Sequence, residues 1–255
     1  MNRQTIKRWA PWLSLVVVFA IATTLLSWWQ FARREERVEK INQVIENYES
    51  KPIELGAVSW LEVGNGLRAD EWRPVTLSGN YLPELAILVR NRPLDGSPGF
   101  LQLVPFRAQD GQVLVIERGW LPAGSDIKEP LTNPLPSSEP VQLLVRLRQG
   151  EADSGKQSVQ GRLDTIDLVE YSQLHPELNL ETRFYGRLAT ETPGSAKAPI
   201  PQPRPSLNEG NHLSYALQWL LFGMMALGAF FFQSAHKNAH RLATMRLLKT
   251  KTNRI

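Results

Sequence analysis

The sequence predicts an α+β membrane protein in which two transmembrane helices, one near each end of the chain, flank one external domain of mainly antiparallel β structure with one or two short helices. Two observations predict this: long apolar segments without charge at residues 9–31 and 211–232, and short apolar runs between them. Only 21% of the 255 residues are charged, so the stretch between the apolar segments has the composition of one folded domain.

The first apolar segment, residues 9–31, has no charged side chain and carries tryptophans at both ends. At about 1.5 Å per residue, a helix of this length crosses a hydrocarbon core of about 30 Å, and its tryptophans suit the two interfaces. The alternative is a cleaved signal peptide, because Ala20-Ile21-Ala22 resembles a peptidase site behind a basic N-terminus. We favour the span, because apolar character continues past Ala22 to Trp29.

The second apolar segment, residues 211–232, has Gln218 as the one strongly polar residue of the run that begins at Leu213. This run is long enough to form the second span. Small residues within a span permit close packing of another helix, so the segment has a candidate contact face. These small residues are Gly223, Ala226, Gly228 and Ala229.

Basic residues are concentrated in the two tails. Residues 1–8 and 233–255 together carry nine lysines and arginines and no acid, which leaves a net charge of −5 for the rest of the chain. Such tails stay in the cytoplasm, so we expect a multi-pass protein of the inner (plasma) membrane with both termini cytoplasmic and a periplasmic domain at residues 32–191. The acidic middle argues against nucleic acid as a partner, whereas the lipid bilayer is an expected one.

The domain between the spans is expected to begin with a helix and to continue as a sheet. Residues 33–49 place apolar side chains three and four apart, which predicts an amphipathic helix that ends before Pro52. Asp110-Gly111 predicts a tight hairpin of type I′, and therefore antiparallel neighbours. Short apolar runs predict strands at residues 75–81, 85–91, 99–108, 112–120, 141–149 and 183–189.

A second helix and a linker are expected late in the domain. Residues 192–210 contain five prolines and no apolar periodicity, so we expect an extended linker that returns the chain to the membrane. Residues 163–174 predict a short helix, because apolar side chains fall on one of its sides. Those side chains are Leu163, Ile166, Val169 and Leu174.

No constellation for catalysis is recognisable, so we expect no enzyme activity, no catalytic residue and no metal site. The chain has no cysteine, which excludes disulfides and thiolate chemistry. His236 and His240 have a ligand spacing but lie in a basic tail without an acid, which favours solvated side chains. His175 precedes Pro176, which favours a surface or capping role. A membrane-tethered hydrolase would have to use His175, the one histidine within residues 52–190.

His212 lies at the outer mouth of the second predicted span. An imidazole there suits a metal or haem iron, or a hydrogen bond to lipid headgroups. Tyr215 and Trp219 follow at i+3 and i+7, so the three side chains share one helical face. From the residues alone, an interfacial aromatic belt with a polar cap competes with a cofactor site.

Four sequence blocks resemble the surfeit locus family of cytochrome c oxidase assembly proteins. Each block is short, and their order, together with the two spans, covers nearly the whole chain. The blocks are Trp29-Gln30 with Arg33, Arg34 and Lys40; Glu71-Trp72-Arg73-Pro74-Val75 leading to Gly79 and Tyr81; residues 115–122, which include Arg118-Gly119-Trp120; and residues 211–219.

This resemblance implies an assembly factor that assists the insertion of haem a into the catalytic subunit of cytochrome c oxidase, or its stabilisation there. It implies transient binding of haem a, with His212 as the axial ligand and Tyr215 and Trp219 as pocket walls. The implied partners are the oxidase catalytic subunit and haem a synthase. The chain departs from the family at residues 158–163, which lack an Asn-x-Trp-type segment, so a partner contact made by that segment is not carried over.

Two of these blocks also have a structural explanation. In Arg118-Gly119-Trp120, the glycine can end a strand, the arginine can pair with a carboxylate and the tryptophan can close the core, as an alternative to binding a partner. In Trp72-Arg73-Pro74, the proline can simply start a strand. The alternative function is a haem-free membrane scaffold whose external β domain binds partner proteins.

Overall fold

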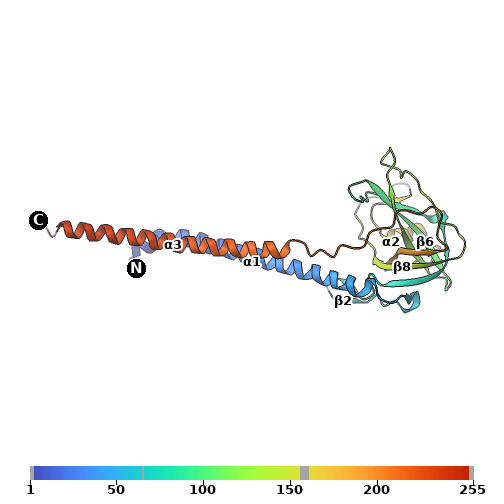
Figure 1. Ribbon diagram of the computed structural model, residues 1–255, viewed down its shortest axis with the longest axis horizontal. Helices are drawn as coiled ribbons and strands as arrows, with labels where there is room; N and C mark the ends of the chain where they lie inside the picture. The colour runs from blue at the N-terminus through green and yellow to red at the C-terminus, as the bar shows by residue number, and fades with distance from the viewer. Residues whose placement is uncertain (1–2, 65, 156–160, 253–255) are drawn as a thin grey trace. The chain divides into compact units, whose positions relative to one another are not determined.

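The computed structural model of the protein describes residues 3–64, 66–155 and 161–252, with side chains in the ranges 9–64, 66–155 and 161–237. The chain forms two compact units. One is a helix pair built from residues up to Glu39 and from Asn208 onward, and the other is a β domain of residues Lys40–Leu207. Figure 1 shows the elements of each unit along the chain.

Over the described residues, the elements are as follows. The helices are α1 Arg3–Tyr48, α2 Leu168–Leu174 and α3 His212–Thr252, and the 3-10 helices are η1 Leu55–Ala57 and η2 Pro83–Leu85. The strands are β1 Ile53–Glu54, β2 Glu62–Gly64, β3 Leu67–Arg68, β4 Pro74–Tyr81, β5 Ile87–Val89, β6 Gly99–Ala108, β7 Val113–Pro122, β8 Val141–Gln149, β9 Arg162–Leu163 and β10 Phe184–Thr192.

In the first unit, α1 and α3 pack side by side and run in opposite directions (Figure 1). Near one end the Ser27 hydroxyl donates to the carbonyl of Ala216 at 2.9 Å, and near the other the rings of Trp9 and Phe230 meet edge to face at 5.8 Å. The less exposed positions of α1 recur three and four residues apart, as in a coiled-coil seam. They are Val16, Ala20, Thr23, Ser27, Gln30 and Arg34.

The outer faces of this helix pair are mainly apolar, whereas the two buried polar side chains of α1, Thr23 and Ser27, lie in the seam. Thr23 and Ser27 are each 2% exposed, while Val18 is 63% and Leu217 is 54% exposed. This distribution is the reverse of that of a water-soluble helix pair, and it suits a surrounding of lipid.

Both helices are long and apolar enough to cross a membrane, over Trp9–Tyr48 and His212–Lys237. The predicted spans, 9–31 and 211–232, lie within α1 and α3. The amphipathic segment at 33–49 is helical, as predicted, but it continues α1 without a break as far as Tyr48.

The β domain is a five-stranded barrel closed in a ring. β4, β6 and β7 are antiparallel neighbours, β8 returns beside β4 as in a Greek key, and β10 fits between β8 and β7. β10 runs parallel to β7, with Gly186 opposite Ile116. β1, β5 and β9 add further pairs outside the ring. The predicted, mainly antiparallel sheet is confirmed, whereas its closure and its parallel pairs were not predicted.

Alternation along the barrel strands produces two apolar cores. Leu114 and Ile116 of β7 point into the barrel and pack in its inner core, whereas Val115 points outward. The outer core is covered by α2 and by the segment before it, which contribute Ile166 and Tyr171. Because β7 is buried on both faces, its sequence is a continuous apolar run rather than an alternating one.

The late helix was predicted five residues too early. The segment 163–174 begins as strand β9, and α2 starts only after Asp167, whose carboxylate accepts the N–H groups of Val169 and Glu170. Since residues 163–167 are not helical, the helical spacing counted from Leu163 does not apply, and Val169 and Leu174 are about half exposed instead of lying on the buried side as expected. The buried side chains of α2 are Leu168 and Tyr171.

The hairpin predicted at Asp110-Gly111 does join β6 to β7, but its turn is not of type I′. Gly111 alone of the two residues has a positive φ, of 87°. The N–H of Gly111 donates to the carbonyl of Ala108, and the N–H of Ala108 donates to the carbonyl of Gln112. This is a three-residue loop with glycine at its left-handed position, which joins antiparallel strands equally well.

Closure of the barrel depends on the close approach of β4 to β6 at Gly79. A Cβ atom at this position would overlap the carbonyl oxygen of Arg107. We predict that Gly79→Ala lowers the free energy of unfolding by at least about 2 kcal/mol, because backbone on the neighbouring strand must move. Chemical denaturation of the full chain in detergent, monitored by circular dichroism, would measure this loss of free energy. Gly56→Ala is the matched control, since nothing lies within 4 Å of its added methyl group; equal losses in both variants would contradict this account.

Candidate functional site

His212 is held at the first position of α3 by Gln30 of α1. Its Nδ1 atom lies 2.8 Å from Oε1 of Gln30, and both side chains are half-buried. Because a carbonyl oxygen can only accept, Nδ1 is the donor in this contact, and in the neutral ring Nε2 then keeps its lone pair. The structure thus brings together two residues from the first and fourth sequence blocks, which are 182 positions apart.

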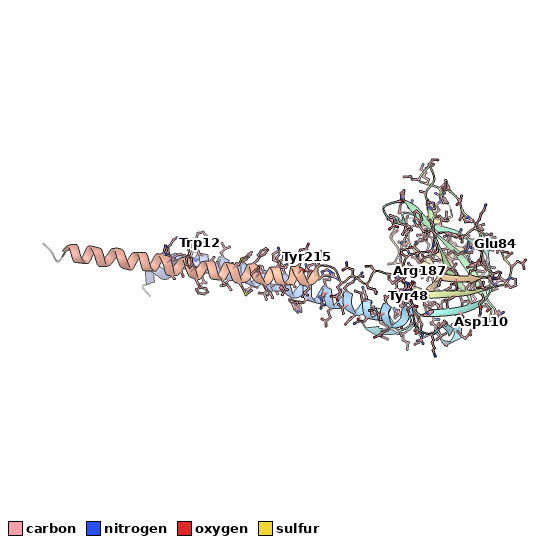
Figure 2. All side chains as sticks on the ribbon, in the orientation of Figure 1. Trp12, Tyr48, Glu84, Asp110, Arg187 and Tyr215 are labelled. Carbon is pink, nitrogen blue, oxygen red and sulfur yellow. The ribbon has the colours of Figure 1, made fainter. Side chains whose placement is uncertain are left out.

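The other aromatic residues predicted for this site do not all face the seam. Trp219 is half-buried, and its ring lies 5.9 Å from that of Phe222. Tyr215 is 50% exposed at the edge of the same face, and its side chain stands out from α3 in Figure 2. Trp29 is 49% exposed with the Arg33 guanidinium 5.8 Å from its ring. A role for Tyr215 and Trp219 as pocket walls stays a prediction.

The donor chemistry at His212 fits the iron of a haem. A histidine ligand coordinates through one ring nitrogen while the other donates to a fixed acceptor, which sets the tautomer and the orientation of the ring. Gln30 is such an acceptor, and Nε2 makes no hydrogen bond to any side chain that the structure describes. Next to this ring lies Gly210, at a positive φ of 75°, where an added Cβ would come within 3.7 Å of Nε2.

Two buried polar residues of the seam were missed by the sequence analysis. Ser27 bonds to the carbonyl of Ala216, and Thr23 lies so close to Gly223 that an added Cβ would be 2.7 Å from its hydroxyl. The spacing of Thr23, Ser27 and Gln30, four and three residues apart, was the available signal. The helix partner expected for Gly223 is therefore α1 of the same chain.

Arg118 lies inside one end of the barrel and has no exposed side-chain surface. Its Nη1 donates to Gln102 at 2.8 Å and to the carbonyl of Pro134 at 3.0 Å, and its Nη2 donates to the Ser195 hydroxyl at 3.1 Å. The carboxylate of Glu191 lies 3.7 Å away. These partners come from β6, from the loop after β7, and from the end of β10 and the segment that follows it, so Arg118 ties the loops that cover this end.

Tyr81 completes this buried cluster. Its ring lies 5.4 Å from the Arg118 guanidinium, and its hydroxyl donates to Glu191 at 3.1 Å. Burial first, and then the charge of Glu191, raises the pKa of the Tyr81 hydroxyl, so this group stays a neutral donor. Arg118 does pair with a carboxylate, as the structural explanation expected, and a role of Arg118 in partner binding stays a prediction.

Gly119 and Trp120 fasten the proline-rich segment to the barrel. Trp120 and Ile200 exchange two backbone hydrogen bonds, of 2.7 and 2.8 Å. A side chain at Gly119 would lie 2.5 Å from the Ile200 carbonyl, and the φ of Gly119 is 143°. Trp120 itself is 5% exposed in the outer core and donates its indole N–H to the carbonyl of Arg92. The segment predicted as an extended linker is therefore hydrogen-bonded to the β domain at Ile200, and its Arg204 pairs with Glu49 further along.

Trp72 lies between two arginines on the outside of the barrel. The guanidinium carbons of Arg148 and Arg187 are 3.8 and 5.2 Å from its ring, and Tyr48 at the end of α1 is 6.0 Å away. Figure 2 labels Tyr48 and Arg187 in this region. Trp72 adopts a positive φ of 70°, a strained conformation for a bulky residue that this packing stabilises. Pro74 begins β4, as the structural explanation predicted.

Arg187 also joins the second sequence block to the third. Its Nε donates to the fully buried carboxylate of Glu117 at 3.2 Å, while its guanidinium covers Trp72. Burial alone would lower the pKa of Arg187, but the charge of Glu117, the nearby Tyr185 and hydrogen bonds to both groups together outweigh burial and raise that pKa. Arg73 in turn pairs with Asp70 at 3.0 Å. The conspicuous residues of these blocks thus hold the β domain together.

The remaining histidines make local contacts. His175 caps α2, and its Nδ1 lies 3.4 Å from the carboxylate of Glu177, as its predicted surface or capping role requires. The imidazole of His236 stacks on Phe232 at 6.2 Å, and the side chain of His240 lies outside the described residues, as do residues 158–160. Among the residues that the structure describes, no three acidic or histidine side chains are grouped to hold a metal ion.

Fold and contacts together define a class of protein: a closed β-barrel domain joined to two helices able to cross a membrane, with polar clusters that serve packing and one histidine whose ring is oriented by a neighbouring helix. The chain belongs to the SURF1 family, whose profile matches residues 17–224. The resemblance to the surfeit locus family is thereby confirmed. Members of this family are known as assembly factors for cytochrome oxidase rather than as enzymes.

Relatives cover most of the chain. An uncharacterized SURF1-like protein of Mycobacterium bovis is 27% identical over 238 residues, which span 90% of this chain and 86% of the relative. A SURF1-like protein of Rickettsia bellii is 26% identical and covers 84% of this chain and 86% of its own. A SURF1-like protein of Dictyostelium discoideum is 27% identical, over 74% of this chain and 65% of its own. The similarity therefore includes both the helix pair and the barrel.

We predict that Arg118→Met lowers the free energy of unfolding by about 3 to 5 kcal/mol, because Glu191 would remain buried without its cation. Arg118→Lys should restore only part of this loss, since one ammonium group cannot reproduce the fork of donors. Denaturation in detergent would measure both variants. Arg204→Gln is the control, because the Arg204 and Glu49 side chains are 72% and 62% exposed in their ion pair, which should contribute less than about 1 kcal/mol. Similar losses for Arg118→Met and the control would show that Arg118 does not stabilise the fold.

The carboxylate of Glu151 accepts hydrogen bonds from the guanidinium of Arg92. The backbone carbonyl of Arg92 in turn accepts the indole N–H of Trp120. Burial alone would raise the pKa of Glu151, but hydrogen bonds from Arg92 and from the N–H of Ile166 outweigh it and lower that pKa below its ordinary 4.5. The interaction of Glu151 with Arg92 therefore stabilises the fold fully above pH 4.5. This stabilisation is lost as the pH falls through the pKa that Glu151 has in the folded protein, which is lower than 4.5. Glu151→Gln should cost about 1 kcal/mol at pH 7 and progressively less below pH of about 4. Urea titrations at both pH values would test it, and a loss independent of pH would contradict it.

Proposed function

We propose that this chain is an assembly factor for cytochrome c oxidase that assists the insertion of haem a into the catalytic subunit, or its stabilisation there. The observation that carries the proposal is the contact of Gln30 with His212 within a member of the SURF1 family. It supplies an oriented imidazole with an uncommitted Nε2 atom, beside residues expected to lie at the outer edge of the membrane.

The proposal includes the topology of the chain. α1 and α3 cross the inner membrane, the basic tails lie in the cytoplasm and the barrel lies in the periplasm. The mainly apolar outer faces of the two helices and the burial of Thr23 and Ser27 between them support this arrangement, because lipid does not solvate polar side chains. The helices would also dock on the oxidase catalytic subunit, and haem a synthase would be a second partner.

In this proposal, His212 coordinates the haem, Gln30 orients its ring, and two aromatic residues flank it. The Gln30 amide oxygen accepts a hydrogen bond from Nδ1–H of His212 and so directs Nε2 away from α1. Trp219 and Tyr215 would supply aromatic walls beside the ring. When haem a is bound, its iron supplies the electrophile that Nε2 coordinates. Holding the haem through one histidine would suit transient holding and transfer rather than permanent retention.

Exposed apolar side chains on the barrel favour a second candidate, the haem-free scaffold that binds partner proteins. In the loop after β7, Ile127 is 70% exposed and Leu131 is 68% exposed. A second group lies at β2, where Leu61, just before the strand, is 69% exposed and Val63, within it, is 62% exposed. Isolated exposed residues of this kind are common, but two groups on loops suit protein contacts. This candidate needs no haem at all, so absorbance of the purified protein separates the two.

We predict that the protein purified from cells that make haem a has a Soret band, and that His212→Ala loses it. Gln30→Leu should weaken haem retention about 10- to 100-fold, because the ring loses the acceptor that orients it. His175→Ala is the matched control and should keep its haem, since His175 belongs to the barrel. Cells without the protein should assemble oxidase that is poor in haem a. Absence of haem from the wild type would favour the scaffold, and unchanged haem in His212→Ala would remove the ligand assignment.

A further inference from the structure

A cavity of about 530 Å³ opens between α1 and α3, far along the seam from His212. It is lined almost entirely by apolar and aromatic side chains, with two polar side chains at one end. The lining residues are Trp9, Trp12, Val16, Ala226, Ala229, Phe230, Gln233 and Lys237.

This cavity exists because large side chains on α1 face small ones on α3. The edge-to-face contact of Trp9 with Phe230 sets the separation of the helices at this end, and the methyl groups of Ala226 and Ala229 cannot fill the space that remains. Nearer His212 the seam is tight, since Gly223 has no room even for a Cβ beside Thr23. The two ends of the same helix pair are therefore packed differently.

The chemistry of the cavity changes along its length. Val16 and Ala226 line its apolar end, while Gln233 and Lys237 line the end nearer the chain termini. The ammonium group of Lys237 lies 5.4 Å from the centre of the Trp9 ring, and none of the described side chains that line the cavity is a carboxylate. Beyond this end, both tails are rich in lysine and arginine and contain no acid.

We propose that this cavity is a binding site for an anionic phospholipid, with one acyl chain between the helices and the phosphate at Lys237. The inference rests on the proposed insertion of α1 and α3 into the bilayer and is independent of haem. In a bilayer an apolar groove of this size is filled by acyl chain, and the aromatic rings at its mouth suit the headgroup level. The excess of positive charge favours an anionic headgroup over a zwitterionic one.

Two substitutions distinguish the contribution of the positive charge to lipid binding from that of the apolar groove. Lys237→Gln removes the cation and leaves the apolar lining, and it should lower the occupancy of bound anionic lipid about fivefold, which is the effect of one cation at an anionic surface. Ala229→Phe fills the groove without changing the charge, and it should lower the occupancy of all bound lipid. Arg33→Gln is the matched control, because it removes one positive charge from α1 beyond the opposite end of the predicted span.

The full chain would be reconstituted into vesicles of equimolar phosphatidylcholine and phosphatidylglycerol, extracted in mild detergent and examined by native mass spectrometry. We expect retained phosphatidylglycerol in the wild type and in Arg33→Gln, and a loss of it in Lys237→Gln and Ala229→Phe. Equal retention of the two lipids, or equal losses in Lys237→Gln and Arg33→Gln, would overturn the inference. An alkaline wash of the vesicles distinguishes its failure from failure of the insertion proposal: protein that is washed off overturns both, whereas protein that stays without a lipid preference overturns only the site.

Discussion

A guanidinium group with no exposed surface must find all its partners inside the protein, and the end of the barrel is organised around this requirement. Arg118 is placed on β7 with its side chain directed inward, where water cannot reach it. An unpaired charge there would cost many kcal/mol, so a carboxylate, an amide, a hydroxyl and a backbone carbonyl are gathered around it. The loop after β7 and the segment after β10 are held in place by these bonds, and Gly119 and Trp120 then extend the attachment to Ile200.

The same requirement, in a different solvent, organises the helix pair. In the proposed lipid surroundings no water is available to serve a hydroxyl or an amide, and three polar side chains of α1, those of Thr23, Ser27 and Gln30, lie against α3. Ser27 finds a carbonyl, and Gln30 finds the ring of His212. Tight packing at Gly223 is the geometric condition for both contacts, because it brings the helix backbones close together. The proposed haem ligand is thus oriented by the packing of the spans themselves.

Arginine and aromatic side chains that stood out in the sequence share a structural explanation. Trp72 is enclosed by Arg148 and Arg187, and Arg187 is held by a buried carboxylate on the strand that also carries Arg118. Conspicuous residues on the barrel are therefore evidence of packing before they are evidence of partner binding. By contrast, the exposed apolar residues of the loop after β7 make no such contribution, and they are the better candidates for contact with other proteins.

Part of the fold could be predicted because it depends on local periodicity. The two apolar helices, the strands β6 and β8 with their predicted bounds, and the hairpin after Ala108 all follow from composition and spacing over a few residues. The start of α2 was missed because a single capping carboxylate, that of Asp167, sets the phase of the helix. The docked part of the proline-rich segment was missed because its partner, Trp120, is 80 positions away.

By itself the sequence determined that the chain has two helices suited to a bilayer and an acidic, sheet-rich domain between them, and it singled out His212 through its position. Only the tertiary structure decided that the sheet closes into a barrel, that Arg118 is buried, and that His212 is paired with Gln30. The physical reason is the range of the interactions. Helix and strand patterns are properties of neighbouring residues, whereas ring closure, buried ion pairs and contacts between helices depend on residues brought together from distant parts of the chain.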